Sequence, residues 1–201
     1  LNLMAFNAAK FRSFMQYGGA RPNLFKVTLT FPPGTTTGSD TDEAFTFLCK
    51  SASLPGMRMG IAQATYFGRK INFAGDREFE PWSVSLYTDE DFKVRNALEA
   101  WQNRMSLLDH DTNAIDGMCD QKTFYVDISV TQLGKDGNLC GHGEGDGHGG
   151  LKTYTLKNAF PSDIGQMALA YDSNDTIAEY EVTWQYDYFT TDRLQKHNYG
   201  P

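Results

Sequence analysis

Apolar and polar residues alternate one by one in several separate stretches of this chain. Alternation with a period of two is typical of a β-strand that buries one face. The stretches that show it are residues 24–31, 45–49, 82–87, 124–131, 151–160, 167–171 and 180–188. Strands should therefore greatly outnumber helices.

Turn signals between these stretches predict how they pair. Pro32 and Pro33 end the first stretch, and a polar loop separates it from residues 45–49, so these two are expected to form an antiparallel hairpin. Residues 167–171 and 180–188 flank a turn at 172–175 and predict a second hairpin. Residues 51–68 show no clean period, which predicts a long connection.

One segment carries the helical period instead. Thr88 is a possible N-cap and residues 89–91 are acidic, which suits the first turn of a helix. Apolar residues then follow at helical spacing, namely Val94, Leu98, Trp101 and Met105. No βαβ alternation is visible, so we expect a single-domain, mainly β protein: an antiparallel two-sheet sandwich or barrel with one flanking α-helix.

Composition narrows the function classes. With 18 Lys and Arg against 25 Asp and Glu, the formal net charge of −7 opposes non-specific capture of nucleic-acid phosphates. No stretch of 18 apolar residues and no secretory leader is visible, so we expect a soluble cytoplasmic chain. The cysteines Cys49, Cys119 and Cys140 are odd in number and form no C-x-x-C pair, which predicts reduced thiols.

The glycine-rich segment 134–150 holds the strongest candidate for a metal site. Cys140, His142 and His148 have side chains that bind transition metals. Ordering so many glycines costs conformational entropy, which favours an exposed linker over a preformed site. We therefore expect no resident metal or cofactor, and a small metal- or ligand-binding β-module remains the alternative function from another class.

Catalytic constellations are weak throughout the sequence. Glu78 with Glu80 could form an acid–base pair, as could the acids at 89–91, but the latter suit a helix N-terminus without any catalytic role. The run Asp109-His110-Asp111 has no serine or cysteine at a recognisable nucleophile turn. We expect a protein that is not an enzyme.

Several short strings, read in order, resemble the inner tail tube proteins of contractile-tailed bacteriophages. They are ARPNLFKV at 20–27, CK at 49–50 with LP at 54–55, GRKI at 68–71, AGDR at 74–77 with Trp82, FP at 160–161 with IG at 164–165, and DSN at 172–174 with EVT at 181–183. The strings span about residues 20–189 and therefore cover most of the chain. The order of the strings and the strand pattern between them resemble those of the family.

The resemblance implies an assembly as well as a fold. Six copies would form a ring whose inner sheets join into a lumen-lining β-barrel, and rings would stack into a tube inside a contractile sheath. The tube would conduct genomic DNA into the host. Implied partners are further copies of the chain, the tail sheath, baseplate and tail terminator proteins, and a tape-measure protein and double-stranded DNA in the lumen, with no membrane. The protein would belong to the virion and assemble in the host bacterial cytoplasm.

Two related roles share the same implied fold. One is a tube-initiating baseplate protein, and the other is the tube subunit of a type VI secretion or tailocin particle. Both would form similar rings but differ in ends and cargo.

The resemblance also implies which parts join the rings. Residues 51–67 resemble a loop that reaches the adjacent ring, and the N-terminal arm 1–20 resembles a second stacking contact. The charged residues among the interface candidates could form ion pairs between subunits, with solvated surface charges as the alternative. The candidates are Leu54, Pro55, Met57, Arg69, Lys70, Asp76 and Arg77. The parts that depart from the family are the loop 32–44, the segment 134–150 and the polar tail 190–201.

Overall fold

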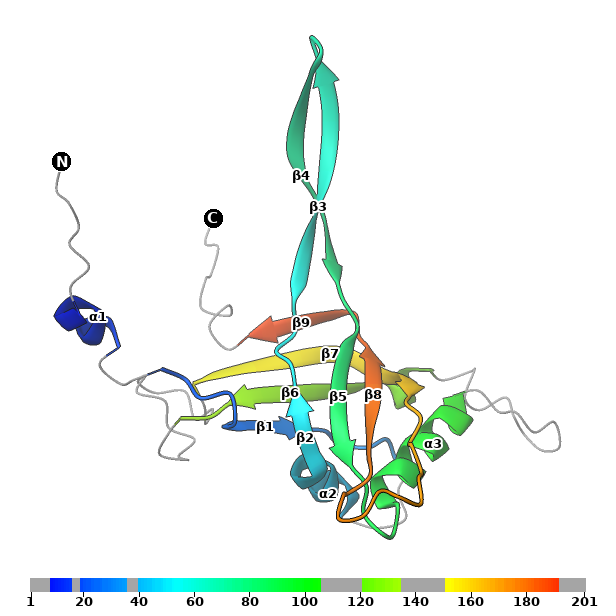
Figure 1. Ribbon diagram of the computed structural model, residues 1–201. Coiled ribbons are helices and arrows are strands. Elements are labelled where there is room, and N and C mark those ends of the chain that lie inside the picture. The colour runs from blue at the N-terminus through cyan, green and yellow to red at the C-terminus, as the bar shows by residue number, and fades with distance from the viewer. Residues whose placement is uncertain (1–7, 16–18, 36–39, 106–120, 135–150, 192–201) are drawn as a thin grey trace.

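A computed structural model describes residues 8–15, 19–35, 40–105, 121–134 and 151–191. Within them, a seven-stranded sheet forms the body and a two-stranded ribbon projects from it (Figure 1). Every strand pairing is antiparallel. The prediction of a mainly β, antiparallel fold is confirmed.

The helices and strands follow one another with short connections. In chain order they are α1 (Ala8–Phe14), β1 (Phe25–Thr28), α2 (Thr41–Leu48), β2 (Cys49–Ala52), β3 (Met57–Tyr66), β4 (Arg69–Phe79), β5 (Trp82–Tyr87), α3 (Lys93–Met105), the 3-10 turn η1 (Gln121–Phe124), β6 (Val126–Gln132), β7 (Lys152–Ile164), β8 (Glu179–Gln185) and β9 (Tyr188–Thr191). The order across the body sheet is β1-β6-β7-β8-β5-β2, and β9 also pairs with β7.

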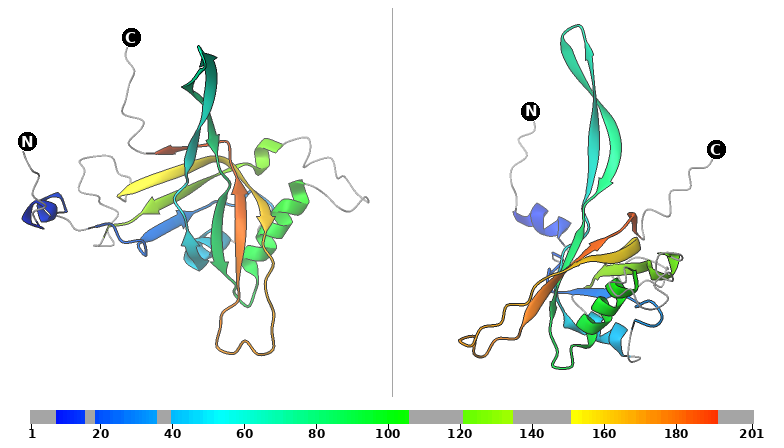
Figure 2. Two further views of the ribbon diagram at one scale, coloured as in Figure 1. Left: turned by 45° about the horizontal axis from the view of Figure 1, so that its top comes forward. Right: turned by 90° about the vertical axis from the view of Figure 1, so that its right-hand side faces the viewer.

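Strand β7 belongs to both halves of the body sheet. Its first part pairs with β6 and β9, and its last part pairs with β8. Between these parts Asn158 adopts a left-handed backbone with φ 57°, and its Nδ2 donates to Asp187 Oδ2 at 2.6 Å. The chain bends there, as strands do where they pass from one sheet to another. The two halves run in different directions and enclose the core (Figure 2).

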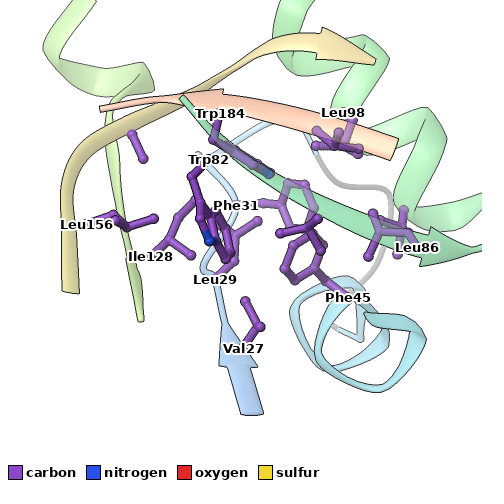
Figure 3. Packing of buried hydrophobic residues seen from close by; sticks show 14 of the residues in the cluster. Val27, Leu29, Phe31, Phe45, Trp82, Leu86, Leu98, Ile128, Leu156 and Trp184 are labelled. Atoms are coloured by element: carbon purple, nitrogen blue, oxygen red, sulfur yellow. The ribbon is translucent and has the colours of Figure 1, made fainter. Parts of the chain in front are cut away.

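The core is dominated by aromatic side chains. The ring of Trp184 lies 5.5 Å from that of Trp101 and 6.2 Å from that of Phe45, both in edge-on arrangements that aromatic pairs prefer. Trp101 also donates its Nε1 proton to the backbone oxygen of Phe124 at 3.0 Å. The buried residues of the whole core come from both halves of the sheet and from α2 and α3, so one core holds the body together (Figure 3).

The predicted central helix is present but begins later than expected. Val94, Leu98 and Trp101 are buried on one face of α3, as their spacing predicts. The helix starts at Lys93, whereas the Thr88 backbone N–H donates to Ala178 O at 2.9 Å. Thr88 is therefore a loop residue rather than the N-cap, and the acids at 89–91 precede the helix.

The strand prediction for residues 45–49 is wrong over most of its length, because α2 occupies Thr41–Leu48. Phe45 is fully buried, while Phe47 is 77% exposed. An alternating strand would place both rings on one face, whereas a helix turns them apart. The helix thus satisfies burial at positions 41 and 45 and leaves Phe47 outside.

The predicted C-terminal hairpin is also wrong. Residues 165–171 form no strand, and β8 pairs with β5 and β7 instead. Long-range pairing therefore overrides the local turn signal at 172–175. The polar tail was expected to begin at residue 190, but residues 190 and 191 belong to β9. Residues 192–201 lie outside the described part.

Other predictions fall partly or wholly outside the described chain. Within the described residues no helix is long and apolar enough to cross a bilayer, and no group of three or more metal-ligating side chains comes together. Cys140, His142 and His148 lie in the undescribed segment 135–150, as Asp109, His110 and Asp111 lie in the segment 106–120.

Burial of Cys49 gives a testable prediction. Desolvation raises the pKa of its thiol from 9.0 to about 12, because burial disfavours the charged thiolate. The substitutions Cys119→Ser and Cys140→Ser leave Cys49 as the single thiol. At pH 8.5, iodoacetamide should alkylate Cys49 at least ~10-fold more slowly in the folded chain than in the chain unfolded by denaturant. Equal rates would contradict this burial. The raised pKa also means that stability should fall as the pH rises above about 9.

Candidate functional site

The ribbon of β3 and β4 is the part of the molecule that differs most from an ordinary folded body. It stands out from the sheet in both figures of the whole chain (Figures 1 and 2). Between residues 57 and 79 every residue is exposed except Gly60, Gly75 and Phe79. The predicted irregular connection at 51–68 is therefore wrong, since most of it is strand. An isolated two-stranded ribbon is only marginally stable in water, so the attachment of this one to the body matters.

The tip of the ribbon is a two-residue turn. Phe67 and Gly68 have φ of 47° and 76°, and Tyr66 pairs with Arg69 on either side of them. Positive φ at both central positions is the pattern of a type I′ hairpin turn, which favours Asn followed by Gly. A phenylalanine there carries a steric cost of roughly 1–2 kcal/mol. Its side chain is 88% exposed, and its ring makes an edge-on contact with the neighbouring ring of Tyr66 at 4.5 Å.

Replacing Phe67 by Asn should separate folding from assembly. The turn loses its strain, so thermal stability should stay equal or rise slightly. If the exposed ring contacts another chain, self-association should weaken about tenfold or more, which sedimentation velocity would measure. A Phe67→Tyr chain serves as the control, because it keeps the ring. Full association by the Asn variant would contradict a contact at the tip.

The two faces of the ribbon are apolar at different heights. Near the body, Met57, Met59 and Ile61 share one face, which we call the base patch. Towards the tip the opposite face carries the tip patch, formed by Tyr66, Ile71 and Phe73. These side chains are 42–67% exposed. The exposed apolar side chains of the ribbon thus form two separate patches on opposite faces.

A bulge lies between the two patches. Gly75 and Asp76 on β4 stand opposite the single residue Gly60 on β3, where the register shifts. Bulges increase the local twist of a strand pair. A Cβ added to Gly75 would lie 3.0 Å from the Gly60 carbonyl carbon, so a side chain there would push the two backbones apart.

A side chain at position 75 should therefore distort the ribbon without harming the body. We expect Gly75→Val to leave the melting temperature within about 2 °C of the parent and to weaken self-association at least ~10-fold, because the ribbon contributes little to the core. Ala74→Val is the matched control: it adds bulk to an exposed position opposite Ile61. Equal loss in both variants would argue against the role of the bulge.

The base of the ribbon is anchored to the body by Phe79. Its ring lies 5.5 Å from that of Phe189 and 6.0 Å from that of Tyr186. Across the base of the ribbon, the indole of Trp82, which follows the ribbon, donates to the backbone oxygen of Ser53, which precedes it, at 2.6 Å. These contacts fix the direction in which the ribbon leaves the body.

The interface candidates from the sequence lie on this ribbon and on the segment that leads into it. Leu54 and Met57 are 46% and 54% exposed, whereas Pro55 is buried. Arg69 and Lys70 lie at the tip, and the other charged candidates lie near the bulge. None of the four charged candidates forms an ion pair within the described part of the chain. The structure thus places Met57 and the charged candidates on the ribbon, at separate heights, and Leu54 and Pro55 before it.

Sequence reasoning missed most of the apolar ribbon residues. The missed residues are Met59, Ile61, Tyr66, Phe67, Ile71 and Phe73. Two short alternations, at 57–61 and at 70–73, separated by Phe67-Gly68, were the available signal. They are hard to see because the apolar residues of β3 have odd numbers up to Ile61 and even numbers after it. The apolar side chains therefore lie on one face of the ribbon before this point and on the opposite face after it.

A second exposed apolar surface lies on the N-terminal arm, which was expected to lack regular structure. Residues 8–14 form α1 instead, and Phe11 and Phe14 are 66% and 80% exposed. No residue of α1 is buried. The arm therefore offers an apolar surface, as the expected stacking role requires.

Comparison with known proteins gives one consistent result. The family model described as phage tail tube protein matches residues 20–192. The tail tube protein gp19 of Enterobacteria phage T4 is 30% identical over 178 residues, which is 89% of this chain and 95% of the relative. A tail tube protein of Serratia phage KSP90 is 24% identical over 186 residues, covering 92% and 96% of the two chains.

Solved structures agree on the fold. A tube-terminating cap of the anti-feeding prophage has a TM-score of 0.56 at 17% identity, covering 95% of this chain and 98% of that one. The sheath/tube terminator of an extracellular contractile injection system, PVC, has a TM-score of 0.54 at 16% identity, covering 86% and 96%. At such identities the likeness concerns the fold alone.

Proposed function

The chain belongs to the phage tail tube protein family, and on that premise we propose that it polymerises as stacked hexameric rings whose joined sheets surround a DNA-conducting lumen. The observation that carries the proposal is the projecting ribbon, because its seven large apolar side chains are exposed in a single chain. Exposed apolar patches of this kind mark protein–protein contacts. Residues 1–201 are taken as one tail-tube domain.

Open sheet edges support ring closure. Strands β1 and β2 lie at the two ends of the body sheet, and each has one side without a pairing strand among the described residues. Unpaired edges template pairing with other chains, and closing a sheet into a barrel removes them. Neighbouring subunits would pair such edges around the ring and join the sheets into one barrel.

The partners follow from the same role. A contractile sheath would surround the tube, baseplate and tail terminator proteins would bind its ends, and a tape-measure protein and double-stranded DNA would occupy the lumen. The acidic excess of the chain suits a conduit, since it opposes adhesion of phosphates. The protein would act in the virion tail after assembly in the host cytoplasm. The proposal assigns it no catalytic role.

Contacts between rings are assigned to two segments. We place one in residues 51–67 together with β4, which carry Leu54, Met57, Arg69, Lys70 and the two charges beside the bulge. The arm 1–20, with the exposed rings of α1, supplies the second contact. Buried Pro55 would act by shaping the approach to β3 rather than by touching a neighbour.

Concentration-dependent assembly tests the proposal. Purified chain is expected to pass from monomers to rings and then to large polymers as its concentration rises, because each ring offers repeated contacts to the next. Sedimentation velocity and light scattering across a hundredfold concentration range would follow this. A chain that stays monomeric throughout, also after addition of purified baseplates, would refute the tube role.

A further inference from the structure

The ribbon has a counterpart at the opposite end of the body. The connection 88–92 and the segment 165–178 lie together at the end that faces away from the ribbon, as both views in Figure 2 show. The backbone bond from Thr88 N to Ala178 O, 2.9 Å long, ties them to each other. We call these two segments the loop end.

The loop end exposes three large apolar side chains. Leu169, Tyr171 and Ile177 are 86%, 109% and 68% exposed. The segment that carries them is held at both ends, since Gly165 N donates to Glu181 O at 2.7 Å and Ala178 O accepts from Thr88. The described structure therefore presents these side chains outwards and buries none of them.

Charges at the two ends are opposite. The ribbon, residues 57–79, has four basic and two acidic side chains and so carries +2, which leaves −9 for the rest of a chain of net charge −7. The loop end has five acids and no Lys or Arg, namely Asp89, Glu90, Asp91, Asp172 and Asp175. Only Asp91 forms an ion pair within the described residues, with Lys93 at 3.5 Å.

From this complementarity we propose that the ribbon tip of one copy docks on the loop end of a copy in the next ring. Arg69 and Lys70 would meet the acids at 172 and 175, while the tip patch and Phe67 would cover the exposed apolar residues of the segment. The occupant of each surface is thus a second copy of this chain. The inference rests on the proposed tube function and names the surfaces that join successive rings.

The geometry suits a repeating contact. Two different surfaces at opposite ends make a head-to-tail contact, which generates an open polymer instead of a closed dimer. The ten residues of β3 reach about 30 Å at the usual rise per strand residue, which carries the tip well clear of its own body. Each subunit of a ring would repeat the same contact, so individually weak ion pairs act together.

Chemical cross-linking of the unaltered protein tests the contact directly. A carbodiimide joins an ammonium to a carboxylate that touches it, without a spacer. In assembled wild-type protein we expect Lys70 to be coupled to Asp172 or Asp175. Lys70 and these two acids lie at opposite ends of the folded subunit, so such a product must link two copies. Lys70 coupled only to carboxylates outside the loop end would overturn the proposal.

Charge reversal provides an independent test. We expect Arg69→Glu with Lys70→Glu, and separately Asp172→Lys with Asp175→Lys, each to raise the concentration needed for assembly at least tenfold. The chain with all four substitutions should regain most of the lost assembly. All these side chains are exposed, so melting temperatures should change little. A slight fall is expected only for chains with Asp175→Lys, because residue 175 has a left-handed φ of 59°; this is checked first. The single substitutions Lys70→Glu and Lys122→Glu are compared as a control. Both reverse one charge, but Lys122 lies away from both surfaces, so its reversal should leave assembly unchanged.

The outcomes separate this inference from the tube function. If wild-type protein forms tubes while the reversed chains assemble normally, the docking proposal is wrong and the tube role stands. If each reversed pair impairs assembly but the four-substitution chain gains nothing, the proposed pairing is wrong as well. If wild-type protein never assembles, the tube function itself fails.

Discussion

A chain without the ribbon should fold normally and fail to form tubes. Replacing residues 58–78 by Asn-Gly leaves Met57 and Phe79, which already pair, joined by a two-residue hairpin turn. Because the ribbon is almost wholly exposed, the body should keep its melting temperature within about 3 °C. Self-assembly should fall below detection at concentrations where the full chain is fully polymerised, as measured by sedimentation velocity.

A variant that keeps the full-length ribbon provides the control for that deletion. Exchanging only Gln63 and Asn72, a cross-strand pair on the face opposite the tip patch, for Ser and Thr keeps the strand length and the apolar patches. This chain should assemble like the parent. Tubes formed by the shortened chain would show that the ribbon is dispensable and would contradict the assigned site.

Loss of the central indole should have the largest effect on stability. Trp184 is fully buried and contacts the rings of Trp101 and Phe45. Truncating such a ring removes buried apolar area and leaves a cavity, so Trp184→Ala should lower the free energy of unfolding by about 3–5 kcal/mol. Urea unfolding followed by circular dichroism measures this, with an unchanged slope if the native state keeps its compactness.

The matched variant Trp184→Phe tests the reason for that loss. The indole Nε1 of Trp184 is buried with no hydrogen-bond partner among the described residues, and an unpaired buried donor is itself unfavourable. Phenylalanine keeps part of the ring and removes this donor, so the loss should be clearly smaller than for alanine. Equal losses in both variants would mean that the cavity is not the main cause.

The strands that bury one face were predictable because their sequence and their environment have the same period. Residues 82–87 alternate in sequence, and β5 alternates between buried and half-buried positions in the structure. The same holds for β6 and β8. For these strands the apolar residues of one parity have a core to pack against, so local pattern and tertiary environment agree.

The wrong predictions have separate physical causes. Residues 41–48 fit two periods at once, and burial of Phe45 against Trp184 selects the helix. Residues 167–171 alternate, but β8 takes both its neighbours from distant segments, which leaves Leu169 and Tyr171 exposed. The apolar residues there were interpreted as one face of a strand, whereas the structure leaves them exposed outside any strand.

The ribbon could be foreseen only in part. Its charged candidates came from the resemblance to phage tail tubes, but its strands were hidden because the apolar side changes face at the bulge beside Gly60. In a strand that faces the core, every second residue is apolar along its whole length. In a ribbon with apolar patches on both faces, this alternation is interrupted. The lack of a clean period in residues 51–68 thus follows from apolar side chains that lie on both faces of the ribbon.

Negative-stain electron microscopy of purified protein over a concentration series would show whether this chain builds a hollow tube by itself. We expect six-fold rings with a central hole at low concentration and stacked tubes at high concentration. Persistent compact monomers at every concentration, including samples seeded with purified baseplates, would contradict it.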